Sequence, residues 1–211
     1  MTVLDRVRDR ILSGAVPAGR PLRQDALAAE LGVSKIPLRE ALGRLEQEGL
    51  VRAEANRGFF VRALSAAEAE EVYALRLTLE PEAAAAGALA ARDSERDEAE
   101  AAVEALEQAI DAHSPAVGAL NRAFHLALVR PAGREVTADI LSRLHVLSER
   151  YVRMHLEPRG RDEEANAEHR ALLSAWLARD GDAVAALSRA HLGRALEDLR
   201  RQLAFSDAGD D

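Results

Sequence analysis

The feature that most constrains the fold is a short helix, a tight turn and a second helix with cations in its first turn. Residues 27–31 form one and a half amphipathic turns, and Gly32 stands where glycine commonly ends a helix. Ser34 is placed to cap the next helix, which carries Lys35 and Arg39 four residues apart on one face. A helix N-terminus with a hydroxyl and two cations can bind a polyanion, as the second helix of a helix-turn-helix does in the DNA major groove.

Two short segments after this helix look like strands. They cover residues 50–54 and 58–62, and the turn-forming cluster 55–58 joins them. With a first helix over residues 2–13, this order predicts a winged helix that has Arg57 at the tip of its wing. The alternative is an ordinary three-helix bundle whose cations only face solvent.

The sequence reads Ser-Lys-Ile-Pro-Leu-Arg-Glu-Ala-Leu at 34–42, Leu-Glu-Gln-Glu-Gly-Leu at 45–50 and Gly-Phe-Phe-Val at 58–61. Over residues 3–62 it resembles the GntR family of bacterial transcriptional regulators. The resemblance implies binding to double-stranded DNA. The residues expected to bind it are Ser34, Lys35, Arg39, Arg44, Arg57 and Gly58. Lys35 departs from the family's arginine, and because lysine is a point donor rather than a fork, we expect an altered base preference or a contact to phosphate only.

Charge is distributed unevenly along the chain. The formal net charge is −8, yet residues 1–64 hold 11 Lys and Arg against 8 Asp and Glu, whereas residues 65–211 hold 17 against 28. The positive excess therefore coincides with the expected winged helix. Because this excess is small, we expect DNA binding that needs a homodimer and weakens with salt.

Composition excludes several classes of protein. The chain has no cysteine, which rules out disulfides and thiolate metal sites. No apolar run approaches the roughly 20 residues that cross a bilayer, and the first residues lack the apolar stretch of a signal peptide. We therefore expect a cytoplasmic protein with no membrane partner.

From residue 65 onward the pattern is helical. Ser65 begins a capping-box pattern, Pro81 is expected to interrupt or restart the helix that follows, and Ser94 is expected to cap the next one. The later helices are expected at 115–129, 135–156, 162–178 and 180–203. The predicted fold is mainly α, with a winged helix-turn-helix (three helices plus a small β-hairpin) at 1–64, an all-helical effector-binding and dimerisation bundle of six to seven helices at 65–205, and a disordered acidic tail at 206–211.

Four residues in the helical part could hold a metal. Asn121 and His125 lie one turn apart on one helix, and His169 and His191 lie on two others. Imidazoles from three helices can meet only inside a bundle, where three His and one oxygen ligand suit Zn²⁺ or another divalent first-row ion. Each histidine taken alone is more simply explained as a surface residue or a hydrogen-bonded core residue.

This helical region is similar to the FCD-type effector domain of the FadR subgroup of GntR regulators. The resemblance covers residues 66–200 and rests on Arg76 with Glu80, Asn121 with His125, Glu-His at 168–169 and His-Leu at 191–192. It implies that Asn121, His125, His169 and His191 bind a divalent metal, with Zn²⁺ expected and Ni²⁺ or Mn²⁺ as alternatives. Many members have Asp where this chain has Asn121, so either affinity is reduced or an anionic effector completes the site. The alternative is a metal-free pocket in which the same histidines hydrogen-bond the effector.

The remaining polar residues of the bundle suggest an effector site. Arg76 is expected to hold an effector carboxylate, and the alternative is a surface salt bridge with Glu80 at i+4. Arg150 and Asn166 lie on helices that should border the same cavity. The other histidines have no motif context, and we interpret them as surface or structural residues: His113, His145 and His155.

These patterns together predict a ligand-responsive transcriptional regulator. We expect a repressor of a metabolic operon that binds a palindromic operator as a homodimer and responds to a small carboxylate. A constitutive DNA-binding protein whose helical part only dimerises is the alternative. A metal-dependent enzyme fits less well, because no general base or nucleophile stands beside a histidine.

Overall fold

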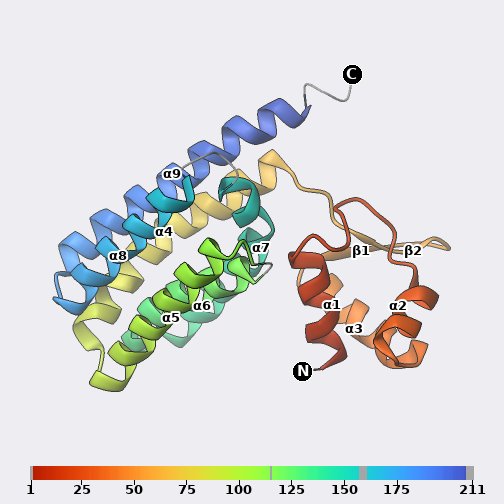
Figure 1. Cartoon of the computed structure of the whole chain (residues 1–211), viewed down its shortest axis with the longest axis horizontal. Helices are drawn as coiled ribbons and strands as arrows, with labels where there is room; N and C mark the ends of the chain where they lie inside the picture. Colours follow the sequence, from red (N-terminus) through yellow and green to blue (C-terminus); the bar gives the residue numbers. More distant parts are fainter. Residues whose placement is uncertain (1, 115, 157–160, 208–211) are drawn as a thin grey trace. The chain divides into compact units, whose positions relative to one another are not determined.

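The computed structural model describes residues 2–114, 116–156 and 161–207. The chain forms two compact units, Met1–Leu64 and Ser65–Asp211 (Figure 1). No helix in the described ranges is both long and apolar enough to span a lipid bilayer. The mainly α fold predicted from the sequence is confirmed.

The N-terminal unit is a winged helix-turn-helix. Its elements are α1 (Val3–Leu12), α2 (Gln24–Leu31), α3 (Lys35–Gln47), β1 (Val51–Glu54) and β2 (Gly58–Val61). Thr2 caps α1 through a reciprocal capping box with Asp5, and Gly32 ends α2 with φ of 65°. The aliphatic side chains on the inner faces of α1 and α3 are almost completely buried and form the core of this unit.

The wing is an antiparallel hairpin whose register pairs Val51 with Val61 and Glu54 with Gly58. Its turn requires left-handed backbone at Asn56 (φ 59°) and Gly58 (φ 86°), which are residue types that adopt this conformation at low cost. An isolated bridge between Pro21 and Phe60 ties the loop before α2 to the hairpin. The hairpin is therefore anchored to the helices of its own unit.

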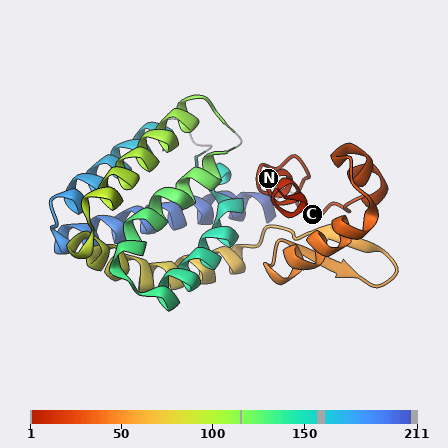
Figure 2. The same ribbon diagram turned by 90° about the horizontal axis from the view of Figure 1, so that it is seen from below.

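The helical unit is a bundle of six α-helices and one 3-10 turn among the described residues. The elements are α4 (Ala66–Ala90), α5 (Asp93–Asp111), α6 (Val117–Val129), η1 (Arg130–Ala132), α7 (Glu135–Leu156), α8 (Arg161–Leu177) and α9 (Gly181–Asp207). The two longest, α4 and α9, run side by side in both ribbon views (Figures 1 and 2). Their facing sides, with those of α6, α7 and α8, enclose the core.

Three expectations for this unit are wrong. The α4 helix continues through Pro81, because Pro81 and Glu80 are buried and tertiary packing outweighs the lost backbone hydrogen bond. The N-cap of α5 is Arg92 rather than Ser94, and its N–H donates to Glu95 Oε2 at 2.9 Å. The α9 helix extends into the expected tail as far as Asp207, since no glycine or proline stops it, and residues 208–211 lie outside the described part of the chain.

At Gly87 the backbone of α4 lies very close to the backbone of α6. A Cβ atom at this position would lie 2.0 Å from the backbone oxygen of Leu128. That oxygen also accepts a 3.0 Å hydrogen bond from Trp176 Nε1 of α8. Three helices are therefore packed around a position that has no room for a side chain.

We predict that Gly87→Ala destabilises the bundle and that Gly193→Ala does not. In Gly87→Ala the added Cβ forces the backbones of α4 and α6 apart. This should lower the free energy of unfolding by about 1–3 kcal/mol or more. A Cβ at Gly193 in α9 meets nothing within 4 Å, so this variant should gain up to about 1 kcal/mol of helix propensity. Urea denaturation of both variants measures the difference, and equal stabilities would contradict the close approach.

Candidate functional site

The exposed face of α3 carries the predicted DNA-binding cations. Ser34 occupies the N-cap with extended backbone (φ −76°, ψ 166°), but its hydroxyl makes no capping hydrogen bond. Lys35 is 63% exposed at the side chain and pairs with Asp25 of α2. Arg39 and Arg44 are exposed, and among the described residues neither makes an ion pair. The helix thus presents a hydroxyl and cations at its N-terminal end, where an anion is favoured.

The wing adds a second set of cations. Arg57 lies in the turn and donates from Nη1 to Glu54 Oε2 at 2.5 Å. The guanidinium groups of Arg57 and Arg52 lie 5.2 Å and 5.3 Å from the centre of the Phe60 ring. Arg52 is absent from the DNA-binding residues predicted from the sequence, although its register position opposite Phe60 in the hairpin could have identified it.

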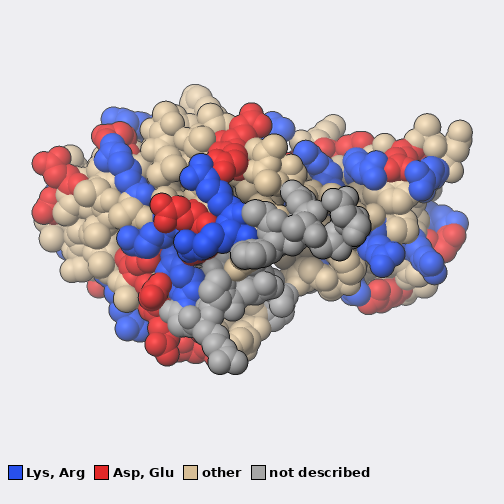
Figure 3. Space-filling view, turned by 90° about the horizontal axis from the view of Figure 1, so that it is seen from above, with Lys and Arg blue, Asp and Glu red and all other residues tan. Residues whose placement is uncertain are grey.

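Positive charge is interrupted on the face of the molecule that Figure 3 shows. On this face, Lys and Arg side chains alternate with Asp and Glu. The positive excess of residues 1–64, with 11 Lys and Arg against 8 Asp and Glu, is small.

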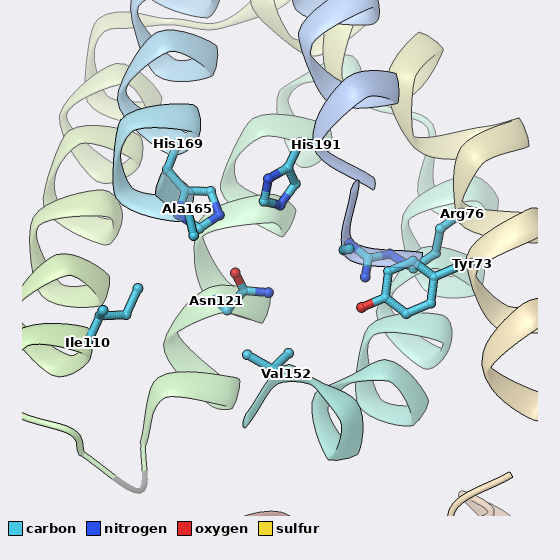
Figure 4. Close-up of a pocket in the computed structure, with 9 residues that line it drawn as sticks. Tyr73, Arg76, Ile110, Asn121, Val152, Ala165, His169 and His191 are labelled. Atoms are coloured by element: carbon cyan, nitrogen blue, oxygen red, sulfur yellow. The ribbon is translucent and has the colours of Figure 1, made fainter. Parts of the chain in front are cut away.

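Three of the predicted metal ligands meet inside the helical unit. His125 comes from α6, His169 from α8 and His191 from α9, and all three are buried. Each offers a ring nitrogen within 4.8 Å of the others, and their ring centres are 4.7–5.6 Å apart. Asn121, one turn before His125, lines a cavity together with His169 and His191, and its amide is directed toward these two rings (Figure 4).

Two of these imidazoles each have a carboxylate next to Nδ1. His125 Nδ1 lies 2.8 Å from Glu80 Oε1, and His191 Nδ1 lies 2.6 Å from Glu168 Oε2. Because an ionised carboxylate only accepts hydrogen bonds, each Nδ1 carries the proton and each Nε2 keeps a free lone pair. His125 Nε2 is buried and has no hydrogen-bond partner. An acceptor atom left in this state, beside two further imidazoles, fits a metal ligand.

The protonation states of these groups also suit a metal. Burial lowers the pKa of His125 and of His191 to about 4, although their carboxylate partners oppose the shift, so both rings are neutral at neutral pH. Burial alone would raise the pKa of Glu80, but Arg76 and the two neighbouring imidazoles hold it well below its ordinary value. The site therefore presents neutral imidazoles backed by ionised carboxylates.

A second group of candidate ligands shares His125. Glu80, His125 and His145 also bring ligand atoms within 4.8 Å of one another. Arg76 forks onto the same carboxylate, with Nε to Oε2 at 2.8 Å and Nη2 to Oε1 at 3.2 Å. A metal cation there would lie against a buried guanidinium, so the group formed by His125, His169 and His191 is the better candidate for a cation.

The remaining histidines partly match expectation. His145 is a structural residue, with 1% exposure and Nε2 at 3.2 Å from Glu80 Oε2, outside hydrogen-bond geometry. No local sequence pattern indicated that His145 would join this cluster. His113 is exposed, and the side chain of His155 lies outside the described residues.

Arg76 forms the expected salt bridge with Glu80, but the pair is buried. The alternative that placed this salt bridge at the surface is therefore wrong about its environment. Its guanidinium pairs with Glu80, donates from Nη1 to Ser148 Oγ at 3.1 Å and borders the cavity (Figure 4). The lining of the cavity combines polar and apolar side chains. Its lining consists of Tyr73, Arg76, Ile110, Asn121, Val152, Ala165, His169, His191 and Ala195. A small anion with a short apolar body fits this lining chemically.

Two predicted effector residues do not line this cavity. Arg150 donates to Glu68 Oε2 at 3.2 Å. Because Val152 of the same helix faces the cavity, a residue two positions earlier is turned away by about 200°. Asn166 is buried with its Oδ1 lacking a hydrogen-bond partner, but its neighbour Ala165 is the one that faces the cavity.

Both units match described families. Residues 1–61 match the bacterial regulatory proteins of the gntR family, and residues 71–194 match the FCD domain. The chain belongs to the GntR family and carries an FCD domain. Both matches agree with the resemblance found in the sequence.

The relatives of this GntR protein are transcriptional regulators rather than enzymes. It is 35% identical over 137 residues to an uncharacterized HTH-type transcriptional regulator of Agrobacterium vitis, covering 61% of this chain and 77% of that protein. It is 33% identical over 138 residues to a probable D-xylose utilization operon transcriptional repressor of Paenarthrobacter nicotinovorans, covering 62% and 60%. Its fold resembles that of E. coli McbR/YncC, with a TM-score of 0.81 over 95% of this chain and 96% of that one at 23% identity.

If the histidine cluster binds a divalent cation, we predict that replacing both His169 and His191 by Ala abolishes that binding. The double variant removes two ring nitrogens that no remaining side chain replaces. Metal per protomer is measured by mass spectrometry on tagless protein purified without chelator. The exposed His113→Ala variant is the control and should keep the wild-type content. Equal metal content in the double variant would contradict the site.

Proposed function

We propose that this GntR regulator is a ligand-responsive repressor of a metabolic operon. The observation that carries the proposal is the pairing of a winged helix with a separate helical unit whose cavity is bordered by a guanidinium and two imidazoles, which a third imidazole, that of His125, approaches within 4.8 Å. The printed name of the Paenarthrobacter relative, a repressor of a D-xylose utilization operon, supports a role in metabolic control.

The proposed DNA complex is a homodimer on a palindromic operator. Residues 1–64 hold 11 Lys and Arg against 8 Asp and Glu, so a single unit with this small positive excess would bind weakly. Two units related by a twofold axis would read two half-sites about 34–36 Å apart, one helical turn of DNA. In this complex the N-terminal end of α3 enters the major groove, and Arg52 and Arg57 of the wing contact the backbone.

The proposed effector is a small carboxylate that binds in the cavity of the helical unit. His125, His169, His191 and Asn121 would hold a divalent cation, with Zn²⁺ expected and Ni²⁺ or Mn²⁺ as alternatives. When bound, the cation supplies a Lewis-acid position for a carboxylate oxygen. Arg76 lies at the same cavity with guanidinium donors to offer the ligand, and the apolar side formed by Ile110 and Val152 accommodates its carbon chain.

Arg39→Ala should weaken binding to operator DNA. The loss of an exposed guanidinium from α3 should cost about 1–3 kcal/mol, or roughly fivefold to 150-fold in affinity. Fluorescence anisotropy on the upstream region of its own gene measures this at two salt concentrations. The control is Arg92→Ala, which removes the same charge from an exposed position of the helical unit. Equal weakening by both variants would mean that only net charge matters.

The same assay tests the response to an effector. Metal-loaded protein is titrated with sugar acids, hydroxy acids and dicarboxylates, and at least one should change the operator affinity fivefold or more. Arg76→Lys should weaken that response, because a lysine that also pairs with Glu80 has fewer donors left for the ligand. DNA binding that no carboxylate alters would favour a constitutive DNA-binding protein whose helical unit only dimerises.

A further inference from the structure

We propose that Glu80 and Glu168 are positioning residues of the histidine site, each fixing one imidazole so that its Nε2 is directed at the bound cation. The inference rests on the proposed metal site and deepens it. Both carboxylates lie outside the expected ligand set of Asn121 and three histidines, and they come from two different helices, α4 and α8.

Each carboxylate fixes the orientation of one imidazole ring. A histidine ring can rotate and can carry its proton on either nitrogen, so a ligand imidazole needs a partner that fixes both choices. Glu80 Oε1 at 2.8 Å does this for His125, and Glu168 Oε2 at 2.6 Å does it for His191. In both pairs the contact is through Nδ1, so the same nitrogen, Nε2, remains on each ring to bind the cation.

Arginine side chains hold both carboxylates in place. Glu80 is 1% exposed and is forked by Arg76, as described above. Glu168 accepts from Arg161 Nη1 at 2.9 Å and from Arg194 Nε at 2.7 Å, in addition to His191. Each carboxylate thus keeps a fixed position relative to the imidazole that it supports.

The two carboxylates also strengthen the imidazoles as ligands of a divalent cation. Three neutral imidazoles and the neutral amide of Asn121 bring no negative charge to a divalent cation. A carboxylate hydrogen-bonded to Nδ1 makes the imidazole a stronger donor at Nε2. Two such carboxylates offset part of what the chain loses by having Asn121 instead of an aspartate.

The test compares three Glu→Gln variants of the full chain. Glu168→Gln and Glu80→Gln remove the charge from the two supports. Glu82→Gln is the matched control, because Glu82 lies on α4 two residues after Glu80 and pairs with Arg189 of α9 at the surface. Zn²⁺ affinity is measured by competition with a chromophoric chelator. We expect about 10–100-fold weaker binding for Glu168→Gln and Glu80→Gln and no change for Glu82→Gln.

A purely structural role is separated by two further readouts. At saturating Co²⁺, the Glu168→Gln variant should keep the wild-type absorption spectrum of the bound cobalt, since the residues that bind the cation are unchanged. Adding Asn121→Asp should restore Zn²⁺ affinity to Glu168→Gln, because the new carboxylate binds the cation without touching Arg161 or Arg194. If Glu80→Gln does not fold, Glu168→Gln decides alone.

The outcomes separate this inference from the metal site on which it rests. Wild-type protein that binds no Zn²⁺ would overturn the metal site and this inference with it. Wild-type binding with an unchanged affinity in Glu168→Gln would overturn the positioning role alone. Weakened binding that Asn121→Asp does not restore would also count against it, since it would indicate a collapsed site.

Discussion

The buried pair of Arg76 and Glu80 is the interaction on which the centre of the helical unit depends. Both side chains are about 1% exposed, and burying two charges is favourable only when they are paired and their remaining hydrogen-bonding positions are filled. Ser148 and His125 fill several of these positions. Removal of either charge would leave the other one buried without compensation, at a cost of about 3–5 kcal/mol.

This pair connects the two parts of the proposed sensing site. Arg76 borders the cavity, Glu80 supports His125, and both residues stand one turn apart on α4. The spacing works only because α4 stays helical up to Pro81. The start of α4 is also fixed, since the hydroxyl of Tyr151 on α7 accepts from the Ser65 N–H at 3.2 Å and donates to Glu68 Oε2 at 2.8 Å. A ligand at Arg76 would therefore act on a helix that is held at its first turn and at its centre.

Local signals in the sequence were enough for the winged helix. Gly32, the turn cluster at 55–58 and the signature around Arg39 act over a few residues, and the structure has helices and strands where they indicate them. The helices of the bundle were also predictable from apolar periodicity, with errors where packing overrides a local rule, as at Pro81. Spacing on separate helices could suggest that three histidines converge, but the family resemblance was needed to select them.

The supports of the site could not be read from the sequence for a physical reason. Glu168 and His191 are separated by 23 residues and meet only because α8 and α9 pack together. The direction of Arg150 depends on the rotation of α7 about its axis, which no local pattern fixes. His145 was overlooked for a similar reason, since its place in the cluster is defined by a partner on another helix.

The most direct test of this account is X-ray diffraction from crystals of the metal-loaded protein, with data collected on both sides of the zinc absorption edge. The account predicts one anomalous peak in each helical unit, within bonding distance of Nε2 of His125, His169 and His191. A peak between Glu80 and His145 would contradict the assignment of the two ligand groups. The absence of any peak from protein saturated with Zn²⁺ in solution would contradict the site itself.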